Sequence, residues 1–445
     1  MLALLRILKG RHSVIVSSLI VFMLLIIGIG VKLFQSEIAT GWAQGDAVKY
    51  HFPVINYFIS QGIDWGYPRG IAMLPGMHVY FATVARILGI SSLSPDGLAA
   101  FLIQTPFAIA YGAVLALAVA RTDTADGIPV HFRWLLVPFL LSSGYAFESW
   151  VWPTTDLPSL LVFAGLIVVL QNGVARGAFT IADALVYSVL ILMGTAFRQS
   201  FAPLAAGLAA MVVLTQPRAT WLRPASLLCI ALPLIAAGFI VLICLWGWGS
   251  LLPPDLQQLG SKSVNYVAGA HVVALTGLIA WPFALSGSRI VAKREDWWRS
   301  RQVWIIALSS ALVAGVLALI VPMTHDTSAG RYFSLVWSLQ DARPLAPFRL
   351  YLVFLMLWTG SYIWSTIAFD ALERRELNPE LVILFIYISS LLFQSNSWQR
   401  YIETPMIISL TILFSRMFKP SALESIFILS WGLFYLSLGI YKSIS

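Results

Sequence analysis

Long apolar runs constrain the fold of this chain more than any other feature of its sequence. The first run, SVIVSSLIVFMLLIIGIGV from Ser13 to Val31, approaches the roughly 20 residues that a helix needs to cross a bilayer. Similar runs recur along the chain, and only 11% of its residues are charged, about half the fraction in soluble domains. A closed β-barrel would show short alternating segments instead. The pattern therefore predicts an all-α, polytopic transmembrane protein that forms a single integral membrane domain over residues 1–445.

The distribution of Lys and Arg predicts the orientation of the chain. We expect about thirteen spans, with the N-terminus on the inner side. The predicted spans lie near residues 12–34, 98–120, 134–150, 156–171, 179–199, 201–216, 225–247, 267–285, 303–322, 350–368, 381–394, 405–416 and 423–441. Most of the 28 Lys and Arg then fall on the inner side, mainly in short loops such as SRIVAKREDWWRSR. The net charge of +8 is thus mainly a topological signal, and we expect no nucleic-acid partner.

Residues 71–90 are apolar enough to resemble a further span. Counting them as a crossing would invert every later loop and place the basic loops outside. We therefore expect juxtamembrane helices in a long first outer loop, residues 35–97. We also expect residues 1–216 to form a catalytic half, and residues 217–445 to bind the donor lipid and support the fold.

Polar residues gather on the predicted outer side, whereas the apolar segments are nearly free of Asp and Glu except Asp183. The outer clusters include GDAVKYHFP (Gly45–Pro53), TTD (Thr154–Asp156), FRQ (Phe197–Gln199), THDTSAGRY (Thr324–Tyr332) and SWQRYIE (Ser397–Glu403). Ionisable groups at membrane depth are unfavourable without a role, so this asymmetry predicts an outward-facing polar site.

Simpler interpretations of single residues remain open. Asp46 and Lys49 are spaced i, i+3 and could form an ion pair on an interfacial helix. Arg198 could be a residue that extends from the end of a span to the interface. His51 follows Asp46 by five residues, about 140° around an α-helix, so the two are not expected to share a face or a metal ion.

Sugar transfer from a lipid phosphate suits this layout. The donor's isoprenoid tail would lie among the spans, while a carboxylate deprotonates the acceptor hydroxyl and arginines neutralise the departing phosphate. The sequence has no Gly-rich nucleotide loop, no Walker motif and no strong metal-ligand spacing. We therefore expect neither a cofactor nor a metal.

Several motifs resemble those of GT-C glycosyltransferases. The stretch from Asp46 to Pro53 is similar to their first outer-loop motif, and LPGMH (Leu74–His78) resembles a later step in the same loop. TTD (Thr154–Asp156) resembles the acidic position of their second outer loop. Within the superfamily, FRQ, GRYFSLVW and QRY are most similar to the dolichyl-phosphate-glucose α-1,2-glucosyltransferase family. Ala47 departs from that family's Asp-Glu start, and the His spacing is one residue longer, which is closer to bacterial GT-C enzymes.

The resemblance implies an inverting transfer of a hexose, with glucose favoured, onto an acceptor hydroxyl. Asp46 would be the general base, with Asp156 positioning the acceptor or replacing Asp46 as the base. The other implied substrate-binding residues are Arg198, Arg331 and Arg400 for the donor phosphate, and Gln199, Tyr332, His51 and His78 for the sugar and acceptor.

The resemblance also implies the partners and the location. They are a polyprenyl- or dolichyl-phosphate sugar donor, a lipid-linked or cell-surface glycan acceptor, and membrane lipids. No Asn-x-Ser/Thr sequon occurs, which favours a bacterial inner membrane with a periplasm-facing site; the endoplasmic reticulum membrane is the eukaryotic equivalent. A lipid-linked-sugar flippase or other transporter, and an O-antigen polymerase or ligase, remain alternatives.

Overall fold

The computed structural model describes the chain in segments. They are residues 45–67, 71, 73–95, 97–120, 149, 151–152, 154–253, 266–292, 297–320, 346–374, 378–392, 399–417, 426–428, 430–434 and 437. Every regular element within these segments is helical. The all-α prediction is confirmed for this part of the chain.

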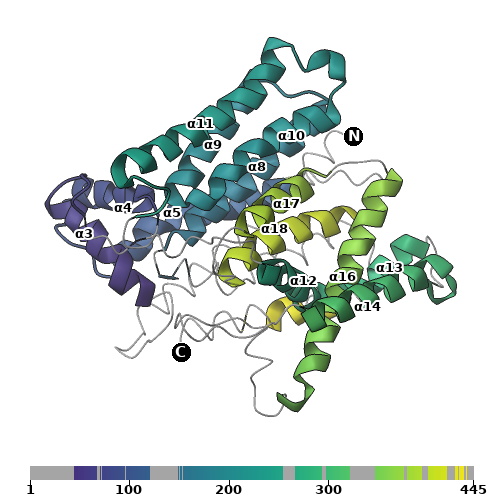
Figure 1. Ribbon diagram of the computed structural model, residues 1–445. Coiled ribbons are helices and arrows are strands. Elements are labelled where there is room, and N and C mark those ends of the chain that lie inside the picture. Colours follow the sequence, from purple (N-terminus) through teal and green to yellow (C-terminus); the bar gives the residue numbers. More distant parts are fainter. Residues whose placement is uncertain are drawn as a thin grey trace, which may run out of the picture. The chain divides into compact units, whose positions relative to one another are not determined.

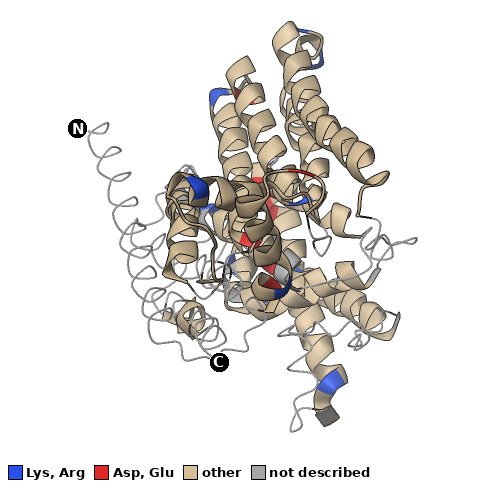
Figure 2. Ribbon diagram, turned by 90° about the vertical axis from the view of Figure 1, so that its left-hand side faces the viewer, with Lys and Arg blue, Asp and Glu red and all other residues tan. Residues whose placement is uncertain are grey.

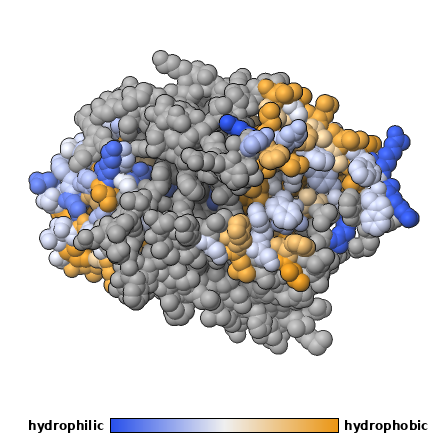
Figure 3. Space-filling view, turned by 90° about the horizontal axis from the view of Figure 1, so that it is seen from below, coloured by the Kyte–Doolittle hydropathy of each residue, from blue (hydrophilic) through white to orange (hydrophobic). Residues whose placement is uncertain are grey.

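Five described helices are long and apolar enough to cross a membrane. They cover Leu98–Leu115, Asp156–Arg176, Pro224–Trp248, Arg301–Leu319 and Arg349–Arg374. Large apolar side chains lie exposed on them, as Figure 3 shows for one face, and Trp246 and Leu319 are 81% and 84% exposed. Charged side chains are sparse along the described helices (Figure 2). These features indicate an integral, multi-pass membrane protein. The count of about thirteen spans stays a prediction, because the predicted spans near 12–34 and 134–150 fall largely outside the described residues.

The described helices form two compact units (Figure 1). The first contains η1 (Ala47–His51), α3 (Phe52–Ser60), α4 (Gly76–Ile87), α5 (Leu98–Ala120), α8 (Asp156–Arg176), α9 (Ile181–Phe197), η2 (Gln199–Ala205), α10 (Ala206–Thr215), η3 (Arg218–Thr220) and α11 (Pro224–Trp248). The second contains α12 (Tyr266–Ala280), η5 (Trp281–Phe283), α13 (Ala284–Ala292), η6 (Trp297–Arg299), α14 (Arg301–Ile320), η8 (Ala346–Phe348), α16 (Arg349–Arg374), α17 (Pro379–Leu391) and α18 (Gln399–Met417). Helix α11, which the sequence-based division places in the second half, packs on α9 in the first unit. The functional roles of the two halves stay a prediction.

Helices α8 and α9 form the central hairpin of the first unit, and an Arg–Asp pair joins them at each end. At one end, Gly177 ends α8 with φ +69°, and Thr180 and Asp183 form a capping box that begins α9. Asp183 also pairs there with Arg176 in the last turn of α8. At the other end, Asp156 begins α8 and pairs with the Arg198 that follows α9. Each charge has the sign that its helix terminus favours, so the sequence stabilises the hairpin at both ends.

The juxtamembrane segment is also helical. Its helix α4 spans 12 residues, Gly76–Ile87. At 1.5 Å per residue this is about 18 Å, well short of the roughly 30 Å hydrocarbon core. As a straight helix, α4 is therefore too short to cross a bilayer alone.

The second unit is organised around α16. Gly277 of α12 and Gly360 of α16 face each other so closely that a Cβ on either would overlap a backbone carbonyl of the other helix. Small residues commonly permit such close packing between membrane helices.

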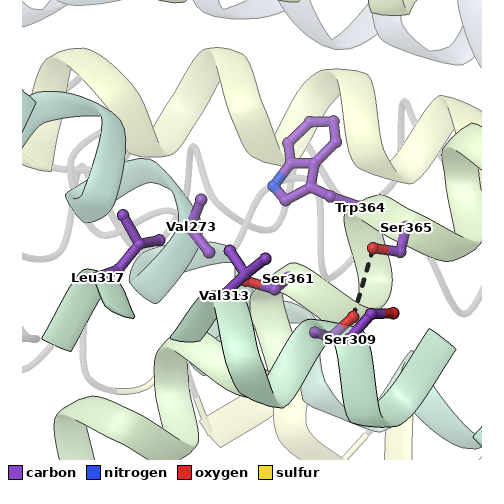
Figure 4. Close-up of a pocket in the computed structure, with 8 residues that line it drawn as sticks. Val273, Ser309, Val313, Leu317, Ser361, Trp364 and Ser365 are labelled. Carbon is purple, nitrogen blue, oxygen red and sulfur yellow. Dashed lines mark hydrogen bonds between the residues drawn. The ribbon is translucent and has the colours of Figure 1, made fainter. Parts of the chain in front are cut away.

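A cavity of about 280 Å³ lies among α12, α14 and α16 (Figure 4). The residues that line it include Ser309, Ser310, Ser361 and Ser365.

The second unit buries three acidic side chains beside its apolar segments. Asp370, Glu380 and Glu403 lie just outside the predicted spans 350–368, 381–394 and 405–416, yet each is at most 4% exposed. Glu380 lies 3.5 Å from Arg416, and Asp370 lies 2.9 Å from Arg374. These two carboxylates lie close to the ends of their helices, where a nearby arginine compensates their charge.

Candidate functional site

A buried ion pair joins two of the predicted site residues. Arg198 adopts an extended backbone conformation directly after α9 and donates from Nη2 to Oδ1 of Asp156. Its Nε donates to the Thr155 hydroxyl at 3.3 Å, and the Thr154 hydroxyl donates to Oδ2 of Asp156 at 3.2 Å. Arg198 and Asp156 are each 8% exposed. Both oxygens of the Asp156 carboxylate are therefore already engaged within the protein.

The start of α4 lies against the end of α9, close to this ion pair. A Cβ on Gly76 would lie only 2.8 Å from the carbonyl oxygen of Ala196, so glycine is what permits the contact. On the same side, Tyr80 packs edge-on against Phe107 at 4.8 Å between ring centroids, and Phe107 packs against Phe197 at 6.1 Å. The LPGMH and FRQ motifs, far apart in the sequence, therefore meet in the fold.

Two histidines connect the first outer-loop motif to α4. The Nδ1 atom of His51 lies 2.9 Å from the Nε2 atom of His78, and the ring centroids are 5.1 Å apart. His51 is 5% exposed and His78 is fully buried. Burial, and then the proximity of His51, lower the pKa of His78 well below its usual value, while the Pro75 carbonyl opposes this shift. His78 is therefore a neutral imidazole near pH 7.

The structure corrects the predicted geometry of Asp46 and His51. Ala47–His51 form a π-helix in which the Phe52 N–H bonds the Ala47 carbonyl, and Asp46 is the residue that precedes it in helical conformation. An i→i+5 bond makes residues five apart neighbours one turn apart. Asp46 and His51 therefore lie on the same face of this turn, whereas α-helical spacing predicts that they diverge.

Gln199 contributes a polar group beside the ion pair. Its Nε2 atom is buried without a hydrogen bond of good geometry among the described residues, and the Cys244 thiol is close enough to interact with its side chain. The hydroxyl of Thr195, four residues earlier, is also buried without a hydrogen bond to another described residue. Next to it, a hydrophobic cluster contains Leu74, Ile240, Cys244 and Trp248, with Trp65 packed against it. A missing Cβ at Gly247 makes room for the Trp65 ring.

The predicted site residues separate into two groups. The first unit brings together Asp46, His51, His78, Asp156, Arg198 and Gln199 along one chain of contacting elements, η1–α4–α9–α8. Arg331 and Tyr332 lie outside the described residues, and Arg400 is the second residue of α18, in the second unit.

Sequence reasoning missed some of the residues at this site. Thr155, Gly76 and Thr195 take part in its contacts although the sequence analysis assigns them no role. The repeated hydroxyls of TTD, and the glycine of LPG, are signals that could have pointed to the first two. No three His, Cys, Asp or Glu side chains in the described part are placed to hold a metal ion.

Comparison with protein-family models, with curated proteins and with solved structures finds no match for this chain. The interpretation of the site therefore depends on its own residues and on the resemblance of its motifs.

Proposed function

We propose that this chain is an inverting glycosyltransferase of the GT-C type. It moves a hexose, with glucose favoured, from a polyprenyl- or dolichyl-phosphate donor to an acceptor hydroxyl of a lipid-linked or cell-surface glycan. The site faces the periplasmic side of a bacterial inner membrane. The observation that carries the proposal is the convergence of the motifs 46–51, 74–78, 154–156 and 197–199 in one unit, because these are the stretches that resemble GT-C enzymes.

The local contacts favour Asp46 over Asp156 as the general base. Asp156 already accepts hydrogen bonds from Arg198 and Thr154, so it is suited to hold Arg198 in place rather than to receive a proton. Asp46 directly precedes the π-helix η1. Helix α3, which follows η1, packs on α4. Its carboxylate removes the proton of the acceptor hydroxyl as that oxygen attacks the anomeric carbon.

Arginines assist the departure of the phosphate. Arg198 shares its guanidinium between Asp156 and the phosphate, and the roles of Arg331 and Arg400 at the phosphate stay predictions from the sequence. Gln199 offers a buried amide N–H to a sugar hydroxyl. The hydrophobic cluster of Leu74, Cys244 and Trp248 beside Gln199 keeps water away from that contact.

The test is transfer by the purified protein in lipid nanodiscs from labelled polyprenyl-phosphate glucose to a lipid extract of the source membranes. Asp46→Asn preserves the shape of the side chain but removes the proton acceptor, so we expect a loss of roughly 10²–10⁴-fold. Asp64→Asn is the matched control, because this exposed carboxylate lies in the same loop but only bonds Tyr57 and the Gly66 N–H.

Two results would contradict the proposal in different ways. A folded wild type that transfers no sugar from any polyprenyl-phosphate donor would remove the proposed function. Activity of Asp46→Asn within about threefold of the wild type would show that Asp46 is not the base. Mass spectrometry of lipid-linked glycans in cells with and without the protein identifies the sugar and the acceptor.

A further inference from the structure

The His51–His78 contact is an unusual use of two buried titratable groups. At 2.9 Å, the facing nitrogens His51 Nδ1 and His78 Nε2 can hold only one proton between them, so one donates and the other accepts. Packing alone would not require imidazoles here, since the other buried side chains of these elements, such as Phe52, Met77 and Phe81, are apolar. The second ring nitrogen of His78, Nδ1, is buried near the Pro75 carbonyl without a hydrogen bond of good geometry, and a buried polar network that is not fully satisfied is unfavourable.

The π-helical turn connects this pair to Asp46. The i→i+5 bonding of η1 places Asp46 one turn before His51 on the same face, and neither η1, α3 nor α4 contains another carboxylate. π-Helical turns are rare and occur frequently at functional sites. Asp46, His51 and His78 thus follow one another from the start of the turn into the interior.

The other titratable groups on η1 and on the helices packed around the pair follow in chain order. They are Lys49, Tyr50, Tyr57, Tyr80, Arg86, Tyr111, Asp156, Arg176, Asp183, Tyr187 and Arg198. Several of them have partners elsewhere. Tyr57 donates to Asp64, Tyr80 to the Ile103 carbonyl, and Arg86 to the Ile59 carbonyl. Arg198 pairs with Asp156, Arg176 pairs with Asp183, and the Lys49 ammonium lies 5.2 Å from the Tyr50 ring centroid.

We propose that His51 and His78 form a proton relay that receives the acceptor proton from Asp46 during sugar transfer. In this step the acceptor oxygen forms its bond to the anomeric carbon while the bond from that carbon to the phosphate oxygen breaks, and the electron pair leaves with the phosphate. The hydroxyl proton passes to the Asp46 carboxylate and then to His51, whose Nδ1–H bond to His78 stabilises the imidazolium. The proton then leaves to solvent, which restores the Asp46 carboxylate for the next turnover.

The burial of His78 suits its position at the end of the relay. A ring that stays neutral near pH 7 keeps Nε2 as an acceptor for the His51 N–H. His51 is then the member that takes the extra charge, and it is also the one nearer to Asp46 in the turn. This inference rests on the proposed function, since it concerns the same transfer step.

The experiment uses the full-length protein in nanodiscs with polyprenyl-phosphate glucose as the donor. His78→Ala removes the acceptor of the His51 N–H, and we expect turnover to fall about 10²-fold, the lower end for a lost proton acceptor, with an unchanged KM for the donor. Free imidazole should restore part of the rate, because a small base can enter the space left by the ring. His51→Gln should lose turnover similarly, without rescue. Thr83→Ala, on an exposed position of the same helix, is the control.

Each outcome decides the inference. Turnover by His78→Ala close to that of the wild type would overturn the relay and leave the proposed function standing. A loss without imidazole rescue, whether or not the melting temperature falls, would also overturn the relay, and a lower melting temperature would assign the pair a structural role. A wild type that transfers no sugar would overturn the proposed function first, and the relay with it.

Discussion

We predict that removing either charge of the buried Arg198–Asp156 pair strongly lowers the free energy of unfolding. The two side chains are only 10% and 11% exposed. Removing one member of such a pair leaves the other charge buried and uncompensated, which destabilises by about 3–5 kcal/mol. We therefore expect Asp156→Asn and Arg198→Gln each to reduce the free energy of unfolding by that amount.

The double variant distinguishes the cause. With both charges removed, no buried charge is left, so the combined loss should be clearly smaller than the sum of the single losses. The coupling free energy should lie toward the upper end of the roughly 0.5–3 kcal/mol found for residues in contact. Unfolding by added SDS in mixed micelles, followed by circular dichroism, measures all four proteins.

The other Arg–Asp pair of the hairpin is the matched control. Arg176 joins Asp183 at the opposite end of α8 and α9, but its side chain is 49% exposed. Solvent screens such a pair, so Arg176→Gln should change stability by only about 0–1 kcal/mol. Additive effects of Asp156→Asn and Arg198→Gln, or losses no larger than that of Arg176→Gln, would refute the reasoning.

Two further predictions concern the packing and the topology. Gly76→Ala should destabilise by about 1–3 kcal/mol and weaken sugar transfer, because its Cβ would approach the Ala196 carbonyl to 2.8 Å; a melting curve like that of the wild type would contradict this contact. Cysteine labelling of Ala292→Cys and Ser328→Cys in intact cells should give opposite accessibility, since the Lys and Arg bias puts the first inside and the second outside. Labelling from the same side would show that the predicted span count is wrong.

The hydrophobic pattern predicts most of the described helices but not their ends. The predicted span 381–394 omits Glu380, because an acid is unfavourable in lipid, yet α17 begins at Pro379 and buries Glu380. Proline in the first turn and an acid at a helix N-terminus are both favourable, and Arg416 supplies a nearby positive charge. Hydropathy sums over a window and cannot register such local compensation.

The sequence indicates the motifs more directly than it indicates which distant motifs pair. The sequence places Asp156 and Arg198 in adjacent outer clusters, and charge alone allows Arg198 to meet Asp46, Asp156 or a ligand phosphate. What selects Asp156 is the α8–α9 hairpin, whose length brings the start of one helix beside the end of the other. That register follows from the cap at Thr180 and the turn at Gly177, not from the functional motifs.

The π-helical turn shows how a local rule changes the geometry of the site. Applying 3.6 residues per turn to Asp46 and His51 separates them by about 140°, and this spacing alone predicts that they share neither a face nor a metal ion. Pro53 supplies the physical reason why the spacing fails: it lacks an N–H, and its ring would clash with the carbonyl of Lys49, four residues earlier. Widening the preceding turn to i→i+5 bonds relieves this conflict, and the bond from the Phe52 N–H to the Ala47 carbonyl belongs to that wider turn. The same proline that appears only as part of a motif in the sequence thus turns His51 onto the face of Asp46, where His78 can hold it.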